Sequence, residues 1–196
     1  MRVIAGKARG HPLIAPDGLN TRPITDKIKE ALFSSWQMKL EGSHFLDLFA
    51  GSGSMGIEAM SRGAEKVVFV EKDRKAIEII KKNLSSCKFT DGYAIYKDDV
   101  FRRIECLKTD GEQFDIVYLD PPFTVDSIFL PVMEALSDSK LLRDDGIIVI
   151  RTRKEKDMPD EVGKLTKYKF KQYGISGVHY YTEFRQEKHP VSDVKI

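Results

Sequence analysis

Apolar and polar positions along the chain follow two periods that succeed one another regularly. Five short apolar runs have the length and composition of buried strands, and they cover residues 44–49, 67–71, 93–96, 114–119 and 147–151. Between them, apolar residues recur at the spacing of helices that bury one face, in residues 56–62, 73–84, 99–108 and 125–138. This alternation predicts an α/β fold with a doubly wound, mainly parallel sheet and helices on both faces.

The two ends of the chain depart from this rhythm. KLTKYKFKQYGIS and GVHYYTEFR are strand-rich with no helix between them, which predicts an antiparallel C-terminal hairpin and seven strands in all. Near the N-terminus, Ile28, Leu32 and Trp36 recur at steps of four, which predicts an amphipathic helix with Thr25 as its N-cap. The first sixteen residues carry two glycines that flank KAR, and they predict a small basic β-hairpin.

The length of 196 residues and the apolar content of 41% are enough for one core. We therefore expect a single domain over residues 1–196, with a hairpin extension (1–24), a core (25–185) and a tail (186–196). The longest apolar run is too short to cross a bilayer, and the N-terminus lacks the apolar block of a signal peptide. A cytoplasmic monomer without membrane contact is expected.

Cysteine and histidine usage gives no sign of a disulfide framework or a metal site. The two cysteines do not form a C-x-x-C pair, and the four histidines lack the spacing of ligands. Charge is more informative, because residues 1–40 carry seven basic and three acidic side chains although the whole chain has a net charge of only +2. A basic end on a mildly acidic body suggests contact with a polyanion, and a solvated basic face is the alternative.

The first predicted strand runs into DLFAGSGSMG, residues 47–56, whose glycines at positions 51, 53 and 56 have the G-x-G-x-x-G spacing. Gly51 and Gly53 would let the backbone turn sharply beside a ligand, and the following helix would offer its N-terminal N–H groups. Glu71 ends the next strand, where a carboxylate can accept hydrogen bonds from two ribose hydroxyls. The turn therefore predicts a ligand that contains adenosine.

Acidic residues around this turn separate S-adenosylmethionine from a nicotinamide dinucleotide. Asp47 lies inside the strand just before the glycines, where its charge would repel a pyrophosphate but attract an ammonium or sulfonium group. Asp98 and Asp99 follow the third strand, at a position suited to an adenine amine. Helix capping or solvation is the ordinary alternative for these two residues. Together the carboxylates favour S-adenosylmethionine.

The tetrapeptide DPPF, residues 120–123, follows the fourth strand. Its two prolines fix φ twice and remove two N–H donors, which leaves carbonyl oxygens in directions that the chain cannot readily change. If the Asp120 carboxylate and the Pro121 carbonyl accept the N–H groups of an exocyclic base amine, its lone pair can be aimed at a methyl group. Phe123 would stack on an unpaired or flipped-out base. A rigid turn that only ends the strand is the alternative.

Taken together, these motifs resemble those of a known family. DLFAGSGSMGIEAMSRGA, VVFVEKDRKAIEIIKKNL and YLDPPF are similar to class I amino-methyltransferases. RVIAGKARGHPL followed by TRPITDKIKEALFSSW resembles the opening of the RsmD family, the bacterial 16S rRNA (guanine(966)-N2)-methyltransferases. The resemblance extends from about residue 2 to about residue 180, and it implies a Rossmann-like class I methyltransferase fold.

The resemblance also implies which residues form each site. Asp120, Pro121, Pro122 and Phe123 would be the catalytic residues that hold the target base. The cofactor-binding residues would be Asp47, Phe49, Gly51, Gly53, Glu71, Asp98, Asp99 and Arg22, with Thr21 near the cofactor carboxylate or the RNA. RNA phosphates would meet Arg2, Lys7, Arg9 and Lys29. The chain differs from the family pattern at Ile24 and Lys27, where threonine and arginine are usual.

The expected activity is methyl transfer from S-adenosylmethionine to the N2 amine of a guanine in 16S rRNA, in the small subunit or its assembly intermediate. An adenine-N6 methyltransferase on DNA or RNA stays open, because DPPF accepts either amine. A third possibility is an RNA-binding assembly factor without turnover, although none of the expected cofactor residues is missing. An NAD-dependent dehydrogenase is disfavoured by Asp47 and by the lack of a recognisable hydride-transfer set.

Overall fold

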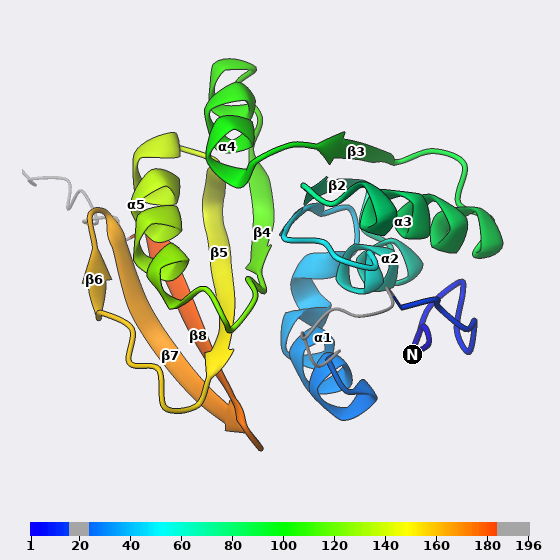
Figure 1. The fold of residues 1–196 in the computed structure, drawn as a ribbon, viewed down its shortest axis with the longest axis horizontal. Helices are drawn as coiled ribbons and strands as arrows, with labels where there is room; N and C mark the ends of the chain where they lie inside the picture. Colours follow the sequence, from blue (N-terminus) through cyan, green and yellow to red (C-terminus); the bar gives the residue numbers. More distant parts are fainter. Residues whose placement is uncertain (16–23, 184–196) are drawn as a thin grey trace, which may run out of the picture.

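The computed structural model describes residues 1–15 and 24–183, which form a twisted sheet with helices against both faces (Figure 1). The sheet has the strand order β3-β2-β1-β4-β5-β8-β7-β6. The strand bounds are β1 His44–Leu48, β2 Lys66–Glu71, β3 Tyr93–Lys97, β4 Phe114–Leu119, β5 Leu142–Arg153, β6 Glu161–Val162, β7 Leu165–Tyr173 and β8 Ser176–Glu183. The predicted α/β class is confirmed.

Strands β1 to β5 pair in parallel, while β8, β7 and β6 continue the sheet in antiparallel pairing. The C-terminal hairpin β7–β8 therefore extends the sheet at the edge of β5, as the sequence predicted. The eighth strand was not predicted. β6 has only two residues, which pair with Leu165 and Thr166 of β7, and so short a strand leaves no alternating pattern to detect.

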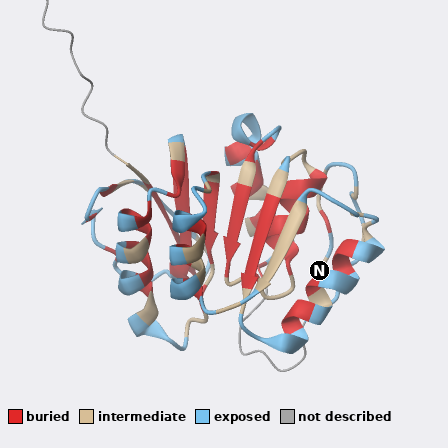
Figure 2. Ribbon diagram, turned by 90° about the horizontal axis from the view of Figure 1, so that it is seen from above, coloured by how far each residue is buried: buried red, intermediate tan, exposed pale blue. Residues whose placement is uncertain are grey.

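The helices divide between the two faces of the sheet. On one face lie α1 (Asp26–Leu40), α2 (Ser54–Ser61) and α3 (Arg74–Ser86); the other carries α4 (Val100–Thr109) and α5 (Phe129–Ser139), the latter preceded by the short helix η1 (Asp126–Ile128). Figure 2 shows buried residues concentrated on the strands and on the inner sides of the helices. None of the helices in the described ranges is long and apolar enough to cross a membrane.

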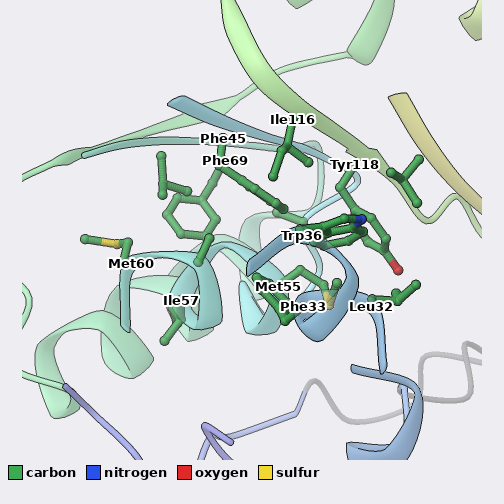
Figure 3. Close-up of a cluster of buried hydrophobic side chains, with 14 of the residues drawn as sticks. Leu32, Phe33, Trp36, Phe45, Met55, Ile57, Met60, Phe69, Ile116 and Tyr118 are labelled. Atoms are coloured by element: carbon green, nitrogen blue, oxygen red, sulfur yellow. The ribbon is translucent and has the colours of Figure 1, made fainter. Parts of the chain in front are cut away.

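The core on the α1 face is built around an aromatic group. Trp36 and Phe33 of α1 pack against Phe45 of β1 and Tyr118 of β4, with Trp36 and Tyr118 ring centroids 6.2 Å apart (Figure 3). Thr25 caps α1 by accepting a hydrogen bond from the N–H of Ile28, as predicted. The buried aromatic contacts fix α1 across the strands whose carboxyl ends carry the candidate site.

Residues 1–15, here called the N-terminal segment, dock on α2. The N–H groups of Ile4 and Ala5 donate to the buried carboxylate of Glu58, at 2.8 and 3.0 Å. This explains why the predicted hairpin is reduced to one antiparallel bridge between Arg2 and Pro12: two of its backbone donors bond to a side chain of α2 instead of the opposite strand.

A glycine makes this docking close. A Cβ atom at Gly6 would lie 1.7 Å from the carbonyl oxygen of Ser61, at the end of α2, so only glycine fits there.

Some predictions lie outside the described residues, namely those on Thr21, Arg22 and the tail at 186–196. Within the described residues, Ile24 is buried and Lys27 is exposed.

Candidate active site

A cavity of about 530 Å³ opens at the carboxyl ends of the central parallel strands. The sequence-predicted residues that line it are Asp47, Phe49, Gly51, Glu71, Asp98, Asp99, Asp120 and Pro122. Ligands of open α/β sheets bind at this edge, where the strand order reverses. Here the reversal lies between β1 and β4, and the cavity is built around it.

The turn after β1 combines backbone strain with close packing. Phe49 has φ +85°, which is a genuine outlier for a bulky residue, and Gly51 and Gly53 have φ +55° and +76°. Strained backbone of this kind is concentrated at ligand sites. Gly56 is needed for another reason, because a Cβ atom there would lie 2.2 Å from the Phe69 ring of β2. The turn thus lines the cavity, and the last glycine lets α2 approach the sheet.

Asp47 is a buried carboxylate with one hydrogen-bond partner among the described residues. Asp47 is 2% exposed, and its Oδ2 accepts a hydrogen bond from the N–H of Gly56 at 3.1 Å. Burial raises the pKa of Asp47 to about 8, and the nearby Asp120 and Glu71 carboxylates add to the rise. The chemistry of this position suits a ligand that brings a positive charge.

Glu71 is oriented by backbone hydrogen bonds on both carboxylate oxygens. Oε2 accepts from the N–H of Gly51 at 2.9 Å, and Oε1 accepts from the N–H of Asp73 at 2.9 Å. Each carboxylate oxygen has a second lone pair. The side chain can therefore receive two ligand hydroxyls without losing the bonds that hold it.

Asp98 and Asp99 both line the cavity but have different partners. Asp98 is ion-paired with Arg103 at 2.7 Å, and its other oxygen accepts from the N–H of Asp99. Asp99 is exposed and caps α4 through Oδ1, which accepts from the N–H of Phe101. Asp98 is thus largely occupied within the protein, whereas Asp99 keeps Oδ2 for a ligand.

Asp120, directly after β4, is held by an arginine that the sequence analysis did not single out. Arg151 of β5 donates from Nε and Nη2 to Oδ2 of Asp120, at 2.9 and 2.8 Å. The Arg151 side chain is 6% exposed and also contacts Oγ of Ser176 at 3.3 Å. The Tyr118 hydroxyl lies 3.5 Å from the same Asp120 oxygen. Among the described residues, these contacts of Asp120 all go to Oδ2, which leaves Oδ1 for a substrate.

The rest of the DPPF motif is divided between two hollows. Pro122 lines the cofactor-sized cavity, and its carbonyl accepts from the N–H of Val125 at 3.0 Å. Pro121 is buried, and no group of the described residues donates a hydrogen bond to its carbonyl. Phe123 lines an adjoining hollow of about 270 Å³, and the Arg151 guanidinium lies 5.0 Å from its ring centroid. Arg151 therefore contacts two residues of the motif, Asp120 and Phe123.

The residues predicted to contact RNA do not share one environment. Lys7 and Arg9 are exposed on the turn of the N-terminal segment, and Arg2 is exposed but ion-paired with Asp26 at 2.9 Å. The prediction for Lys29 is wrong. Its side chain is 0% exposed, donates to the Arg2 carbonyl at 2.6 Å and pairs with Glu58 at 3.3 Å. Lys29 holds the N-terminal segment in place from beneath and has no surface for RNA.

The sequence does contain a signal for Arg151. An arginine directly follows the apolar run IIVI of a central strand, and a cation so placed needs a buried partner. Glu58 gave no comparable signal, because a lone glutamate on a short helix is usually solvated.

Comparisons with known proteins agree with this geometry. The family described as "Conserved hypothetical protein 95" matches residues 1–182. YlbH of Bacillus subtilis is 38% identical over 92% of this chain and 98% of its own length. Ribosomal RNA small subunit methyltransferase D of Haemophilus influenzae is 36% identical, over 81% of each chain. The structure of yhhF from Escherichia coli has a TM-score of 0.80 and 28% identity, and the match covers 95% of this chain and 99% of that one.

These matches span almost the whole described chain, and they include relatives that carry the name of the family recognised from the sequence motifs. That resemblance is therefore confirmed. The chain belongs to the Conserved hypothetical protein 95 family, the family of ribosomal RNA small subunit methyltransferase D.

Proposed function

We propose that this chain transfers a methyl group from S-adenosylmethionine to the exocyclic N2 amine of a guanine in 16S rRNA, in the small subunit or its assembly intermediate. The family and its named relatives support the coarser statement, an S-adenosylmethionine-dependent methyltransferase of rRNA. The observation that carries the finer proposal is the Asp120 carboxylate, fixed by Arg151 beside the cavity with one oxygen left for an amine.

The residues around the cavity fit S-adenosylmethionine. Asp47, buried without a cationic partner among the described residues, would receive the ammonium of the methionine part. Glu71 would hold the ribose hydroxyls, and Asp99 would accept from the adenine amine. When bound, the cofactor would supply a methyl group on a sulfonium, an electrophile that an amine nitrogen can attack, with the C–S bond breaking to leave a neutral thioether.

The target amine needs two acceptors in a fixed geometry. Its nitrogen is a poor nucleophile as long as the lone pair is delocalised into the ring. Oδ1 of Asp120 and the carbonyl of Pro121 would each accept one N–H, which favours a pyramidal nitrogen with its lone pair directed away from both acceptors. Because the prolines and Arg151 fix these oxygens beforehand, little reorganisation is needed at the moment of attack.

Asp120 would also stabilise the positive charge that forms on the amine nitrogen. As the new N–C bond forms, the nitrogen becomes positive, and the adjacent carboxylate stabilises it and then takes one proton. Burial raises the pKa of Asp120, while the Arg151 guanidinium acts in the opposite direction and favours the ionised form. Arg151 thus keeps available the state of Asp120 that the reaction needs.

Phe123 and the N-terminal segment would act on the RNA. The Phe123 ring, partly exposed and braced by Arg151, would stack on a base displaced from its helix. Lys7 and Arg9, exposed on a segment anchored to α2, would contact phosphates. Since α2 begins at the glycine turn, this segment is connected rigidly to the cofactor side of the site.

The direct test is transfer of labelled methyl from S-adenosylmethionine to unmodified small ribosomal subunits, with naked 16S rRNA and DNA as parallel substrates. Nuclease digestion and mass spectrometry then identify the methylated nucleoside. N2-methylguanosine in rRNA is the expected product. N6-methyladenine would leave the chemistry of Asp120 intact but overturn the choice of base, and the absence of any product despite cofactor binding would overturn the proposed activity.

A further inference from the structure

We propose that one face of strand β7 binds the single-stranded RNA next to the target base. This surface, here called the β7 face, consists of Tyr168, Lys169, Lys171 and Tyr173. The last three alternate along the strand, and Tyr168 joins them because a register shift falls between Lys167 and Lys169 and its ring centroid lies 6.1 Å from that of Tyr180. The inference rests on the proposed function, because it assigns a second contact surface to the same RNA.

Strand register places the β7 face on the same side of the sheet as the catalytic residues. Lys169 and Lys171 stand opposite Tyr180 and Val178 of β8, and residues opposite each other in an antiparallel pair point to the same face. Val178 in turn stands opposite Arg151 of β5. Because Arg151 contacts Asp120, the β7 face continues the side of the sheet that holds the target amine.

The same strand register gives the distance between the β7 face and Asp120. Leu119 pairs with Ile150, so Asp120 lies level with Arg151, then Val178, then Lys171, across β4, β5, β8 and β7. Three strand spacings of about 4.8 Å put the Lys171 backbone about 14 Å from that of Asp120. Nucleotides next to a base held at Asp120 can reach so close a surface.

The β7 face is exposed to solvent and carries two lysines without acidic partners in the part of the chain that the structure describes. Tyr168 is 51% exposed, and Lys171 is exposed beside it. The Lys169 ammonium lies 4.9 Å from the Tyr180 ring centroid, and burial together with the nearby Lys171 charge lowers the pKa of Lys169. Within the described ranges, neither Lys169 nor Lys171 forms a salt bridge with a carboxylate, in contrast to Lys167, which pairs with Asp160 at 2.7 Å.

Aromatic and cationic side chains that lie next to each other on an exposed sheet face favour single-stranded RNA over other occupants. Tyrosine rings offer stacking surfaces for bases, and uncompensated lysines attract the phosphates between them. Residues 164–173 contain four lysines and no acidic residue, so the charge of the strand is complementary to RNA.

The β7 face and the N-terminal segment lie on opposite sides of the site. In Figure 1 the N-terminal segment lies to the right of α1, while β7 and β8 lie to its left. The segment is anchored beside the cofactor turn, and the β7 face continues from Asp120. RNA bound to both would pass across the mouth of the cavity, with the target base between the two contacts.

The test measures binding of fluorescein-labelled, in-vitro-transcribed 16S rRNA by anisotropy over a range of salt concentrations. The variants are K169Q/K171Q and Tyr168→Ala, with K108Q/K140Q as the matched control. The control removes the same two charges near the amino ends of β4 and β5, away from the site. Melting temperature and S-adenosylmethionine affinity are measured for every variant to show that the fold and the cofactor site are unchanged.

We expect K169Q/K171Q to lower the slope of log affinity against log salt by about 1.4, since each lost contact with a single strand contributes about 0.7. Tyr168→Ala should lower affinity about tenfold by removing a stacking surface, and the control should match wild type. Wild-type slope and affinity in the first two variants would overturn the inference and leave the proposed function standing. Failure of the wild-type protein to bind rRNA would instead overturn both.

A second substrate distinguishes RNA from protein as the occupant. If K169Q/K171Q binds naked rRNA normally but binds intact small subunits more weakly, the β7 face contacts a ribosomal protein, and the RNA assignment is wrong. Equal loss on naked rRNA and on subunits supports the RNA assignment.

Discussion

Two carboxylates at the ends of neighbouring strands, the buried Asp47 and the partly exposed Asp120, behave in different ways. Asp47 belongs to β1 and Asp120 follows β4, and the two strands pair with Asp47 opposite Tyr118. In the part of the chain that the structure describes, Asp47 accepts a single hydrogen bond, from the backbone N–H of Gly56. Asp120 has two guanidinium contacts from Arg151 within 2.9 Å. The protein therefore supplies a counter-charge to one carboxylate and leaves the other for a ligand.

This difference matches the order of events in a transfer reaction. In the proposed reaction the cofactor brings its own positive charge, so an unpaired Asp47 would gain most from binding it. The target amine would arrive neutral and become positive only during transfer, so Asp120 would have to be ionised before that charge exists. Arg151 favours the ionised form and offsets part of the rise in the pKa of Asp120 that burial causes.

The largest expected effect is that of Asp120→Ala on the chemical step. Removing the acceptor for the amine should lower kcat by about 10³-fold, in the range for loss of a preorganised polar group. Affinity for S-adenosylmethionine should stay within about twofold, because the contacts proposed for the cofactor do not include Asp120. Single-turnover methyl transfer and cofactor titration measure the two quantities separately. Asp138→Ala, at an exposed aspartate of α5, is the control, and near-normal turnover of Asp120→Ala would contradict the proposed role.

Arg151→Met should have the next largest effect, about 10²-fold on kcat, and it should also move the pH profile. Without the guanidinium, burial alone acts on Asp120 and raises its pKa further. The acid limb of the kcat profile should therefore shift to higher pH, so that activity is lost sooner as pH falls. Arg151→Lys retains a charge but not the two parallel contacts, and it should recover part of the rate and part of the shift.

A lower rate with an unshifted profile would mean that Arg151 supports the structure without acting on Asp120. Melting temperature provides the companion readout, since removing one partner of a buried pair destabilises the fold. A D120N/R151M double variant should be closer to wild-type stability than Arg151→Met alone, because no unpaired carboxylate remains.

The comparison also separates what sequence could predict from what it could not. Asp47, Glu71 and Asp120 were assigned because each lies near or just after the carboxyl end of a strand, and parallel strands bring their carboxyl ends to one edge. The alternation of strands and helices was sufficient for that step. Local patterns therefore predicted the sheet, the cavity and most of its lining.

Side-chain pairing across strands was beyond the sequence, because it depends on register and burial. Arg151 meets Asp120 only after β4 and β5 align, and Lys29 meets Glu58 only after α1 packs beside α2. Lys29 was assigned to RNA because it belongs to a basic stretch, yet the helix turns it inward. Charge counted along a chain does not reveal which charges the fold has already paired.

Asp47→Asn addresses the other carboxylate, and its effect should appear in binding. Replacing the carboxylate with an amide retains an acceptor for the Gly56 N–H but removes the charge that faces the ligand ammonium. S-adenosylmethionine affinity should fall about 30-fold, within the range for losing one partner of a desolvated charge pair. At saturating cofactor, kcat should change by less than about threefold. Titration calorimetry and steady-state transfer measure both, and a large loss of kcat at saturation would place Asp47 in the chemical step.

The smallest expected signal is the number of protons released when S-adenosylmethionine binds. It depends most directly on the difference in charge state between Asp47 and Asp120. Because the pKa of Asp47 lies at about 8 in the free protein, this carboxyl is protonated at pH 6.5 and must ionise to face an ammonium. The α-amino group of the ligand, with an ordinary pKa of about 7.7–8.0, is already charged at that pH. Binding should therefore release about one proton, measured by calorimetry in buffers of different ionisation enthalpy. Asp47→Asn should release none, whereas Asp120→Ala should release as much as wild type, since Arg151 rather than the cofactor sets the charge of Asp120. Equal release from wild type and Asp47→Asn would mean that the two carboxylates do not differ in this way.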